Sequence, residues 1–325
     1  MRSKRNFLFI LLIFLSVSSC FCQEQRVEIL FSPPADLNDK LSEYIDNSAQ
    51  SVKGCFYSVN NKKVASSLIK AHIRGIQIQI VMDEGRIFEE DSFYPQLKNF
   101  GLVKKDTVTK GLMHHKFCVI DKKLVWTGSY NPSPHAIYAN NDALIIQSKE
   151  LAGIYLREFQ KLWEAKTGSK DKKHSSGVII DEETEIEVYF SPEEGNAILK
   201  RLCKILKEAK TSIYFAQFTV THPDIAEILI KKASEGVSVQ GIMEYDQIGR
   251  YSQYPKFKLS GIDVKQDKNY FFPFHHKFFI IDEKIVITGS LNPTKAGLNS
   301  NRENIIFIES PEIAQKYLKY FKSIR

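Results

Sequence analysis

Two segments of the chain carry the same spaced set of six residue types, H-x-K-x4-D-x6-G-S-x-N. One copy lies in each half, and the two copies are 161 residues apart. The first comprises His114, Lys116, Asp121, Gly128, Ser129 and Asn131, and the second His275, Lys277, Asp282, Gly289, Ser290 and Asn292. Two matches at repeat-related positions make a chance occurrence implausible.

These residue types suit chemistry on a phosphodiester. Attack on phosphorus develops charge on oxygen, and paired lysines, serines and asparagines would form a preorganised clamp for that charge. One neutral imidazole can attack phosphorus and form a phosphohistidine. A second, protonated imidazole can donate to the leaving oxygen, an effect typically worth about 10²–10⁴-fold. Because each half supplies one such histidine, we expect a single site formed by two halves packed face to face.

Strand geometry explains the spacing within each motif. Residues i and i+2 of a strand share a face, so the histidine and lysine of one motif should point together. The intervening His115 and His276 should point the other way, and such an HH pair cannot easily ligate one metal ion. Asp121 and Asp282 belong to the candidate catalytic set, but their place at a turn favours a structural role.

The duplicated HxKxxxxD with a following GSxN resembles the phospholipase D superfamily, over essentially all of the chain after the first residues. The resemblance implies a pseudo-twofold arrangement, a covalent phosphohistidine and neither metal nor cofactor. His114 would be the nucleophile and His275 the general acid, although the symmetry leaves the reverse assignment open. In this family an acidic residue after GSxN often orients the catalytic imidazole, and Asp142 and Glu303 are expected to do so here. The phosphate-binding residues implied are Lys116, Lys277, Ser129, Ser290, Asn131 and Asn292.

Other segments repeat with the same period. Residues 75–82 read GIQIQIVM, and residues 236–243 read GVSVQGIM. The chain is therefore expected to contain two copies of one domain of about 150 residues, a normal domain size. Residues 167–177, TGSKDKKHSSG, form a predicted flexible linker between domains at 23–166 and 178–325.

Each half alternates strand and helix patterns. In the first half, hydrophobic periodicity predicts strands at 27–31, 52–59, 76–82, 113–120, 123–127 and 143–147, and helices at 36–50, 62–72 and 150–165. The alternation predicts an α/β fold of two tandem domains, each a mixed β-sheet flanked by helices.

The first 22 residues are predicted to be a signal peptide. Arg2, Lys4 and Arg5 precede an unbroken apolar run at 7–15, which is too short to span a bilayer. The small residues before Cys20 resemble a lipoprotein cleavage site, in which Cys20 would be lipidated; ordinary cleavage nearby is the alternative. We therefore expect export, to the periplasm, the medium or a lipid anchor. Loss of three basic residues would lower the formal net charge from +7 to +4.

The composition, 43% hydrophobic and 26% charged, is that of a soluble globular protein and not of a disordered or collagenous one. Cys55, Cys118 and Cys203 are widely spaced within apolar stretches. They are expected to be buried thiols and not a zinc site or a disulfide framework.

The expected substrate is a phospholipid, cleaved to phosphatidate and a head group, because export places the protein beside membranes. A nonspecific metal-independent nuclease acting on DNA or RNA is the alternative, since the mild basicity suits either anion. A catalytically inactive anion-binding module is the third reading. A monomer suffices, because one chain holds both half-sites. An aromatic cluster is expected in the core, or alternatively as a lip that contacts lipid or stacks on bases: Tyr270, Phe271, Phe272 and Phe274.

Overall fold

The computed structural model describes residues 26–107, 111–165 and 177–325. The predicted signal segment, Cys20 and most of the predicted linker lie outside these residues. Within the described ranges, no helix combines the length and the apolar character that crossing a bilayer requires.

The first half folds as one sheet with helices on both faces. Its strands are β1 (Val27–Ser32), β2 (Ser51–Phe56), β3 (Gln77–Asp83), β4 (Val103–Asp106), β5 (Lys116–Ile120), β6 (Leu124–Gly128) and β7 (Asn141–Gln147). Its helices are α1 (Leu37–Asp46), α2 (Lys62–Ile73), α3 (Tyr94–Asn99) and α4 (Lys149–Trp163), with short 3-10 turns η1 (Glu84–Arg86) and η2 (Pro134–Ile137).

The second half repeats this order after one additional strand. Its strands are β8 (Val178–Asp181), β9 (Thr184–Ser191), β10 (Ser212–Gln217), β11 (Ser238–Met243), β12 (Asp263–Gln266), β13 (Lys277–Ile281), β14 (Ile285–Gly289) and β15 (Glu303–Glu309). Its helices are α5 (Gly195–Glu208), α6 (Pro223–Ser234), α7 (Tyr254–Leu259), α8 (Lys295–Asn299) and α9 (Pro311–Ile324), with the 3-10 turn η3 (Tyr245–Gln247).

The two sheets have the same topology. The first runs β1-β7-β6-β5-β2-β3-β4, and the second runs β9-β15-β14-β13-β10-β11-β12 with β8 added beside β9. In each sheet the three strands at one end are parallel and the others pair antiparallel. The sheets are therefore mixed, as the alternation of elements predicted, and the duplication is structural as well as sequential.

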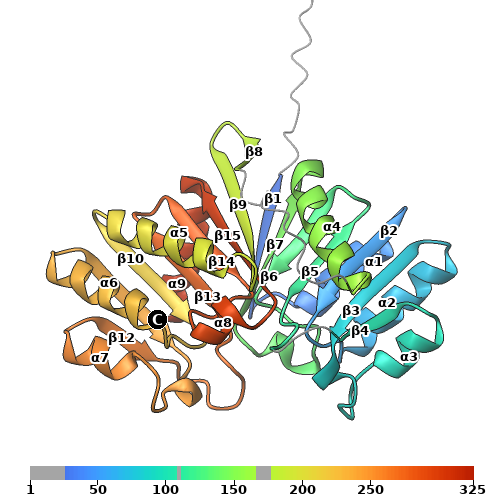
Figure 1. Cartoon of the computed structure of the whole chain (residues 1–325), viewed down its shortest axis with the longest axis horizontal. Helices are drawn as coiled ribbons and strands as arrows, with labels where there is room; N and C mark the ends of the chain where they lie inside the picture. Colours follow the sequence, from blue (N-terminus) through green and yellow to red (C-terminus); the bar gives the residue numbers. More distant parts are fainter. Residues whose placement is uncertain (1–25, 108–110, 166–176) are drawn as a thin grey trace, which may run out of the picture.

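Helices α4 and α9 lie between the two sheets, and the other helices cover the outer faces. Figure 1 shows the sheets on either side of a central seam, with α2 and α3 at one outer end and α6 and α7 at the other. One hydrophobic cluster draws on α4, α9 and the inner faces of both sheets. Two further clusters fill the spaces beneath the outer helices. Because the central cluster is shared, burial of apolar surface holds the halves in one arrangement.

Local signals account for most of the element boundaries. The Asp36 side chain accepts hydrogen bonds from two backbone N–H groups at the start of α1, and Asn61 does the same for α2. Gly75 has a φ of 90° just after α2, as a helix-ending glycine should. Helix α1 ends at Asp46, four residues before the predicted end, because β2 begins at Ser51.

Cys55 and Cys118 are buried and Cys203 is half-buried, and all three are free thiols. Burial of the first two agrees with the prediction that they act as small apolar residues.

Candidate active site

The backbone at the start of each histidine motif is hydrogen-bonded to the opposite half of the molecule. Met113 forms a parallel β-bridge with Arg302, and the N–H of His114 donates to the Arg302 carbonyl at 2.9 Å. In the same way the N–H of His275 donates to the Asn140 carbonyl at 2.9 Å. The segment that precedes each motif is therefore hydrogen-bonded to the segment that precedes β7 or β15 of the other half.

Carboxylates at the ends of β3 and β11 hold the same segments from their own halves. The Met113 N–H donates to Asp83 at 2.8 Å, and the Phe274 N–H donates to Glu244. The two carboxylates are 161 residues apart, so the repeat spacing relates them, although they lie outside the duplicated motif.

The two motif histidines have different partners. His114 Nδ1 lies 2.8 Å from Oε2 and 2.9 Å from Oε1 of Glu303, and His114 is 8% exposed. His275 Nδ1 lies 3.0 Å from the amide oxygen of Asn141. Both partners come from the other half, so the two motifs meet in one site. A carboxylate contacts Nδ1 of one imidazole, and a neutral amide contacts Nδ1 of the other.

The expectation that Asp142 orients a motif histidine requires correction. Gly128 pairs with Ala143 and Gly289 with Ile305, so strand positions in β7 and β15 correspond at a spacing of 162. The second half has one more residue between its GSxN and this strand, because Asn292 to Glu303 is eleven positions and Asn131 to Asn141 is ten. A shift of one residue moves a strand side chain to the other face. The equivalent of Glu303 is therefore Asn141.

Asp142 instead lies in the interior and joins the two halves. Its carboxylate accepts hydrogen bonds from Ser129 Oγ at 2.8 Å, Thr288 Oγ1 at 2.6 Å and the Tyr317 hydroxyl at 2.9 Å. His276 Nδ1 lies 3.3 Å from it. Despite burial, the pKa of Asp142 lies below its ordinary value through bonding to His276, Thr288 and Ser129.

The inner histidines face away from the site, as strand alternation predicted. His276 Nε2 lies 3.0 Å from the Tyr320 hydroxyl, on the opposite side of the ring from Asp142. His115 Nε2 lies 3.6 Å from Glu158 on α4, and among the described residues neither nitrogen of this ring has a hydrogen-bond partner. Each motif histidine thus lies above a buried layer that contains a second imidazole and one carboxylate.

The motif lysines occupy equivalent places in the two halves. Lys116 Nζ donates to the His114 carbonyl and Lys277 Nζ to the His275 carbonyl, each at 2.7 Å. Lys116 also lies 5.2 Å from the centre of the Tyr57 ring, and Lys277 lies 5.1 Å from that of Phe218. The same two rings contact His114 and His275 edge-on. The aromatic pair was missed from sequence, although it too has the spacing of 161.

Burial and the two lysines control the protonation of the site. Burial, together with the charges of Lys116 and Lys277, holds the pKa values of His114 and His275 well below the ordinary histidine value. Burial also lowers the pKa of Lys116 to about 7, and it raises the pKa of Glu303 to about 7. Without a bound anion these shifts favour the neutral imidazoles, and Glu303 and Lys116 titrate near pH 7. The negative charge of a bound phosphodiester opposes the shift and favours protonation of an imidazole.

The motif asparagines are better placed than the serines to meet a substrate. Ser129 and Ser290 are buried and accept hydrogen bonds from the N–H groups of Asp142 and Asn304, at 3.0 and 2.9 Å. The side chains of Asn131 and Asn292 make no hydrogen bond within the described part of the chain, and their Oδ1 atoms are buried. In this arrangement the asparagine amides are free for a ligand, and the serines stabilise the strands that carry Asn141 and Glu303.

Asp121 and Asp282 lie away from the other motif residues. Asp121 follows β5 and is five residues from Lys116, roughly 16 Å along an extended strand. Its carboxylate accepts hydrogen bonds from the N–H groups of residues 49–51 at 2.7–3.1 Å, and Asp282 does the same for residues 210–212 at 2.7–3.0 Å. These aspartates fasten the β5 and β13 hairpins to β2 and β10. The expectation that Asp121 and Asp282 belong to the catalytic set is therefore corrected, because both lie away from the site.

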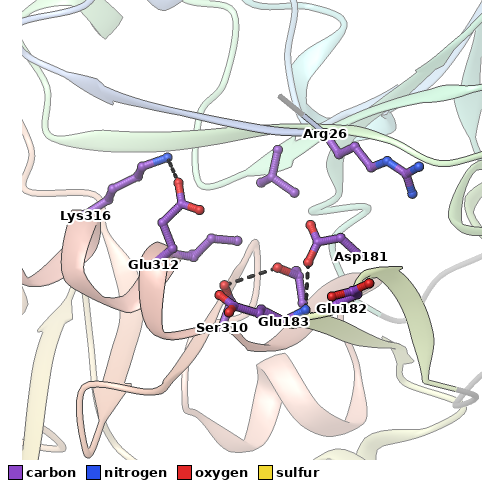
Figure 2. A pocket seen from close by; sticks show the side chains of 10 residues that line it. Arg26, Asp181, Glu182, Glu183, Ser310, Glu312 and Lys316 are labelled. Atoms are coloured by element: carbon purple, nitrogen blue, oxygen red, sulfur yellow. Dashed lines mark hydrogen bonds and ion pairs between the residues drawn. The ribbon is translucent and has the colours of Figure 1, made fainter. Parts of the chain in front are cut away.

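A pocket elsewhere in the molecule contains none of the motif residues. It lies between the start of β1, the β8–β9 turn and the start of α9, as Figure 2 shows. Carboxylates dominate its lining: Asp181, Glu182, Glu183 and Glu312. A lining of this charge repels a phosphodiester, so the site at the motifs remains the candidate. In the described ranges, no three His, Cys, Asp or Glu side chains gather where they could hold one metal ion.

Comparisons with known proteins agree with this geometry. The family model described as "Cardiolipin synthase, PLD-like domain" matches the chain twice, at residues 41–163 and 202–325. Mitochondrial cardiolipin hydrolase from Canis lupus familiaris is 33% identical over 131 residues, which are 40% of this chain and 51% of that protein. Phospholipase D from Rickettsia bellii is 28% identical over 135 residues, which are 41% of this chain and 67% of that protein.

A solved structure shares the fold over both halves. Phosphatidylserine synthase from Haemophilus influenzae aligns with a TM-score of 0.73 at 12% identity, over 93% of this chain and 87% of that one. The curated relatives are matched over only about half to two thirds of their own length. Their names therefore do not transfer directly to this chain.

The hairpin role of Asp121 can be tested by substitution. Asp121→Asn should lower the free energy of unfolding by about 1–2 kcal/mol, because three backbone N–H groups lose a charged acceptor. Urea unfolding followed by fluorescence measures this change. Hydrolysis of a soluble phosphodiester by the folded variant should stay within about threefold of the parent. A thousandfold loss of kcat in a variant with unchanged stability would contradict the structural role.

Proposed function

The chain belongs to the phospholipase D superfamily, and from that premise we propose that it hydrolyses phospholipids through a covalent intermediate on His114. The assignment of His114 as the nucleophile rests on one observation, that the Nδ1 atoms of the two imidazoles have different partners. Glu303 backs His114, whereas Asn141 backs His275. The pseudo-symmetry of the motifs alone offers no such distinction.

A carboxylate at Nδ1 favours His114 as the nucleophile. When Glu303 is ionised, it accepts a hydrogen bond from the Nδ1–H group of His114, and this tautomer has its lone pair on Nε2. The same carboxylate stabilises the positive charge that the ring acquires when Nε2 bonds to phosphorus. Asn141 orients the ring of His275 without adding negative charge, so a protonated His275 releases its proton more readily. That property suits the general acid.

The proposed reaction has two steps. In the first, Nε2 of His114 attacks phosphorus, the bond between phosphorus and the head-group oxygen breaks, and His275 gives its proton to that oxygen. In the second, His275 removes a proton from water, the water oxygen bonds to phosphorus, and the bond between His114 and phosphorus breaks. Phosphatidate and the head-group alcohol are the products. Lys116, Lys277 and the asparagine amides offset the charge that develops on the phosphoryl oxygens.

The choice of phospholipid draws support from outside the site geometry. Matched relatives bear the names cardiolipin hydrolase and phospholipase D. The predicted signal peptide would place the mature protein outside the cytoplasm, beside or anchored to a membrane. We propose export on that basis.

Turnover assays with two kinds of leaving group test the roles of the histidines. The protein would be incubated in EDTA with phosphatidylcholine vesicles, and separately with single-stranded DNA and RNA. His114→Ala and His275→Ala should each lower head-group release by at least about 10²-fold. A p-nitrophenyl diester, whose leaving group departs without a proton, should restore the first step in His275→Ala, seen as a rapid burst of p-nitrophenolate, but not in His114→Ala.

The alternatives correspond to other results of the same assays. Restoration in His114→Ala instead would reverse the two roles. Cleaved nucleic acid with intact vesicles would make the protein a nuclease, and no turnover of any diester would make it an anion-binding module.

The pH dependence of kcat/KM follows from Glu303 and Lys116. The pKa of Glu303 is raised to about 7, so its ionised form is present above that pH and is lost as the pH falls. The pKa of Lys116 is lowered to about 7, so its charge is present below that pH and is lost as the pH rises. We therefore expect a narrow bell centred near pH 7 for a soluble diester.

Single substitutions should change the acid limb and the alkaline limb of this pH profile of kcat/KM separately. Glu303→Gln should remove the acid limb and lower the plateau, and Lys116→Arg should move the alkaline limb to higher pH. A profile that is flat from pH 5.5 to 8.5, or one that neither variant alters, would be inconsistent with these assignments.

A further inference from the structure

Five segments of the described chain lie at the strand ends next to the motif histidines, and together we call them the rim: residues 84–93, 111–113, 134–140, 245–251 and 267–273. They follow β3 and β11 or precede β5, β7 and β13, and they lie along the lower side of the molecule in Figure 1, on both sides of the seam between the sheets. Arg86 lies 4.6 Å from the centre of the Tyr57 ring that contacts His114. The rim is therefore continuous with the catalytic residues.

The rim carries most of the exposed large apolar side chains. Ten such side chains are exposed in the described part of the chain, and six of them lie on the rim. They are Phe88, Leu112, Tyr138, Tyr251, Tyr270 and Phe271. Phe271 is 89% exposed and Phe88 is 84% exposed. Apolar groups gathered from five segments on one side of the molecule indicate an interaction surface, whereas single exposed residues would not.

Hydrogen bonds hold part of this apolar surface in place. Asn269 accepts hydrogen bonds from the N–H groups of Phe271 and Phe272 and donates to the Tyr138 carbonyl at 3.4 Å. The Tyr138 and Phe272 rings stack with centroids 4.7 Å apart. Of the four aromatics expected in the core, Phe274 is buried, Phe272 is half-buried, and Tyr270 and Phe271 are exposed. The folded loop therefore directs Phe271 outward.

The charges of the rim argue against nucleic acid as its partner. Its five segments contain six carboxylates and only three basic side chains, Arg86, Arg250 and Lys268. Nucleic acids are bound mainly through phosphate contacts to lysine and arginine, and single strands add aromatic stacking to a positively charged groove. An acidic rim repels such a backbone, and it also repels a strongly anionic membrane.

A zwitterionic lipid surface has the complementary chemistry. Phenylalanine and leucine enter the boundary between head groups and acyl chains, and tyrosine rings lie at the level of the head groups. A quaternary ammonium head group is attracted by aromatic faces and by carboxylates. Contact of the rim with the bilayer would bring a lipid phosphate near the motif residues, of which His114 is 8% exposed.

We propose that the rim docks the protein on zwitterionic phospholipid membranes, so that its substrate is a lipid whose head-group alcohol is cationic, such as choline. This inference rests on the proposed function and narrows it to one class of phospholipid. Docking depends on apolar insertion and not on attraction between net charges.

A paired substitution of the rim tests the proposal. Phe88→Ser with Phe271→Ser should weaken binding to phosphatidylcholine vesicles at least about tenfold in a sedimentation assay, because two large apolar side chains no longer enter the lipid. The matched control is Ile73→Ser with Leu259→Ser, which removes two side chains that are 71% and 89% exposed but lie outside the rim. The control should bind as the parent does, and thermal unfolding should confirm that both variants are folded.

Lipid composition and salt provide the second measurement. Binding of the parent protein should persist in 0.5 M NaCl and should not increase when cardiolipin replaces part of the phosphatidylcholine. Equal binding by the rim variant, or binding that needs cardiolipin and disappears in salt, would overturn the proposal. So would a rim variant that loses affinity for single-stranded DNA while keeping its affinity for vesicles.

Docking and hydrolysis can fail separately. Vesicle binding that depends on the rim without head-group release would leave the docking surface standing and refute the proposed hydrolysis. Head-group release that is equal in the parent and the rim variant would refute docking through the rim and leave the hydrolysis standing.

Discussion

Each motif histidine is held by a side chain from the opposite half, and the rest of the candidate site depends on this exchange. Glu303 reaches across to His114, and Asn141 reaches across to His275. The hydrophobic cluster around α4 and α9 sets the distance between the sheets, so the crossed contacts form only when that core is packed. The geometry of the site therefore depends on the packing of the core that both halves share.

The exchange also makes a symmetric fold chemically asymmetric. One additional residue before β15 places a carboxylate where the first half has an amide. In the first half, which lacks this residue, Asp142 points inward and accepts hydrogen bonds from Thr288 and Tyr317 of the other half. A buried carboxylate is costly unless fully hydrogen-bonded, and this one has partners from both halves. The difference of one residue between the halves thus goes with one acid at the site and the other at the interface.

Much of this could be predicted from sequence, because the repeat and the motif spacing are local properties. The α/β alternation, the mixed sheets, the opposed directions of adjacent histidines and the turn at Asp121 all follow from periods of two and 3.6 residues. The partner of His275 could not be predicted in this way. The motifs and β7 and β15 have different repeat spacings, 161 and 162 residues, and only strand pairing reveals which residue faces the site. Exposure of Phe271 likewise depends on a loop conformation that periodicity does not describe.

The most direct test of the account is to identify the residue that carries phosphorus during turnover. The protein would be mixed with a lipid labelled at phosphorus, quenched in alkali within milliseconds, digested and mapped by mass spectrometry. The account predicts an alkali-stable phosphohistidine at His114, in larger amount when Glu303 is intact than in Glu303→Gln. Label on His275, or turnover without any phosphohistidine, would contradict the assignment of the nucleophile to the carboxylate-backed imidazole.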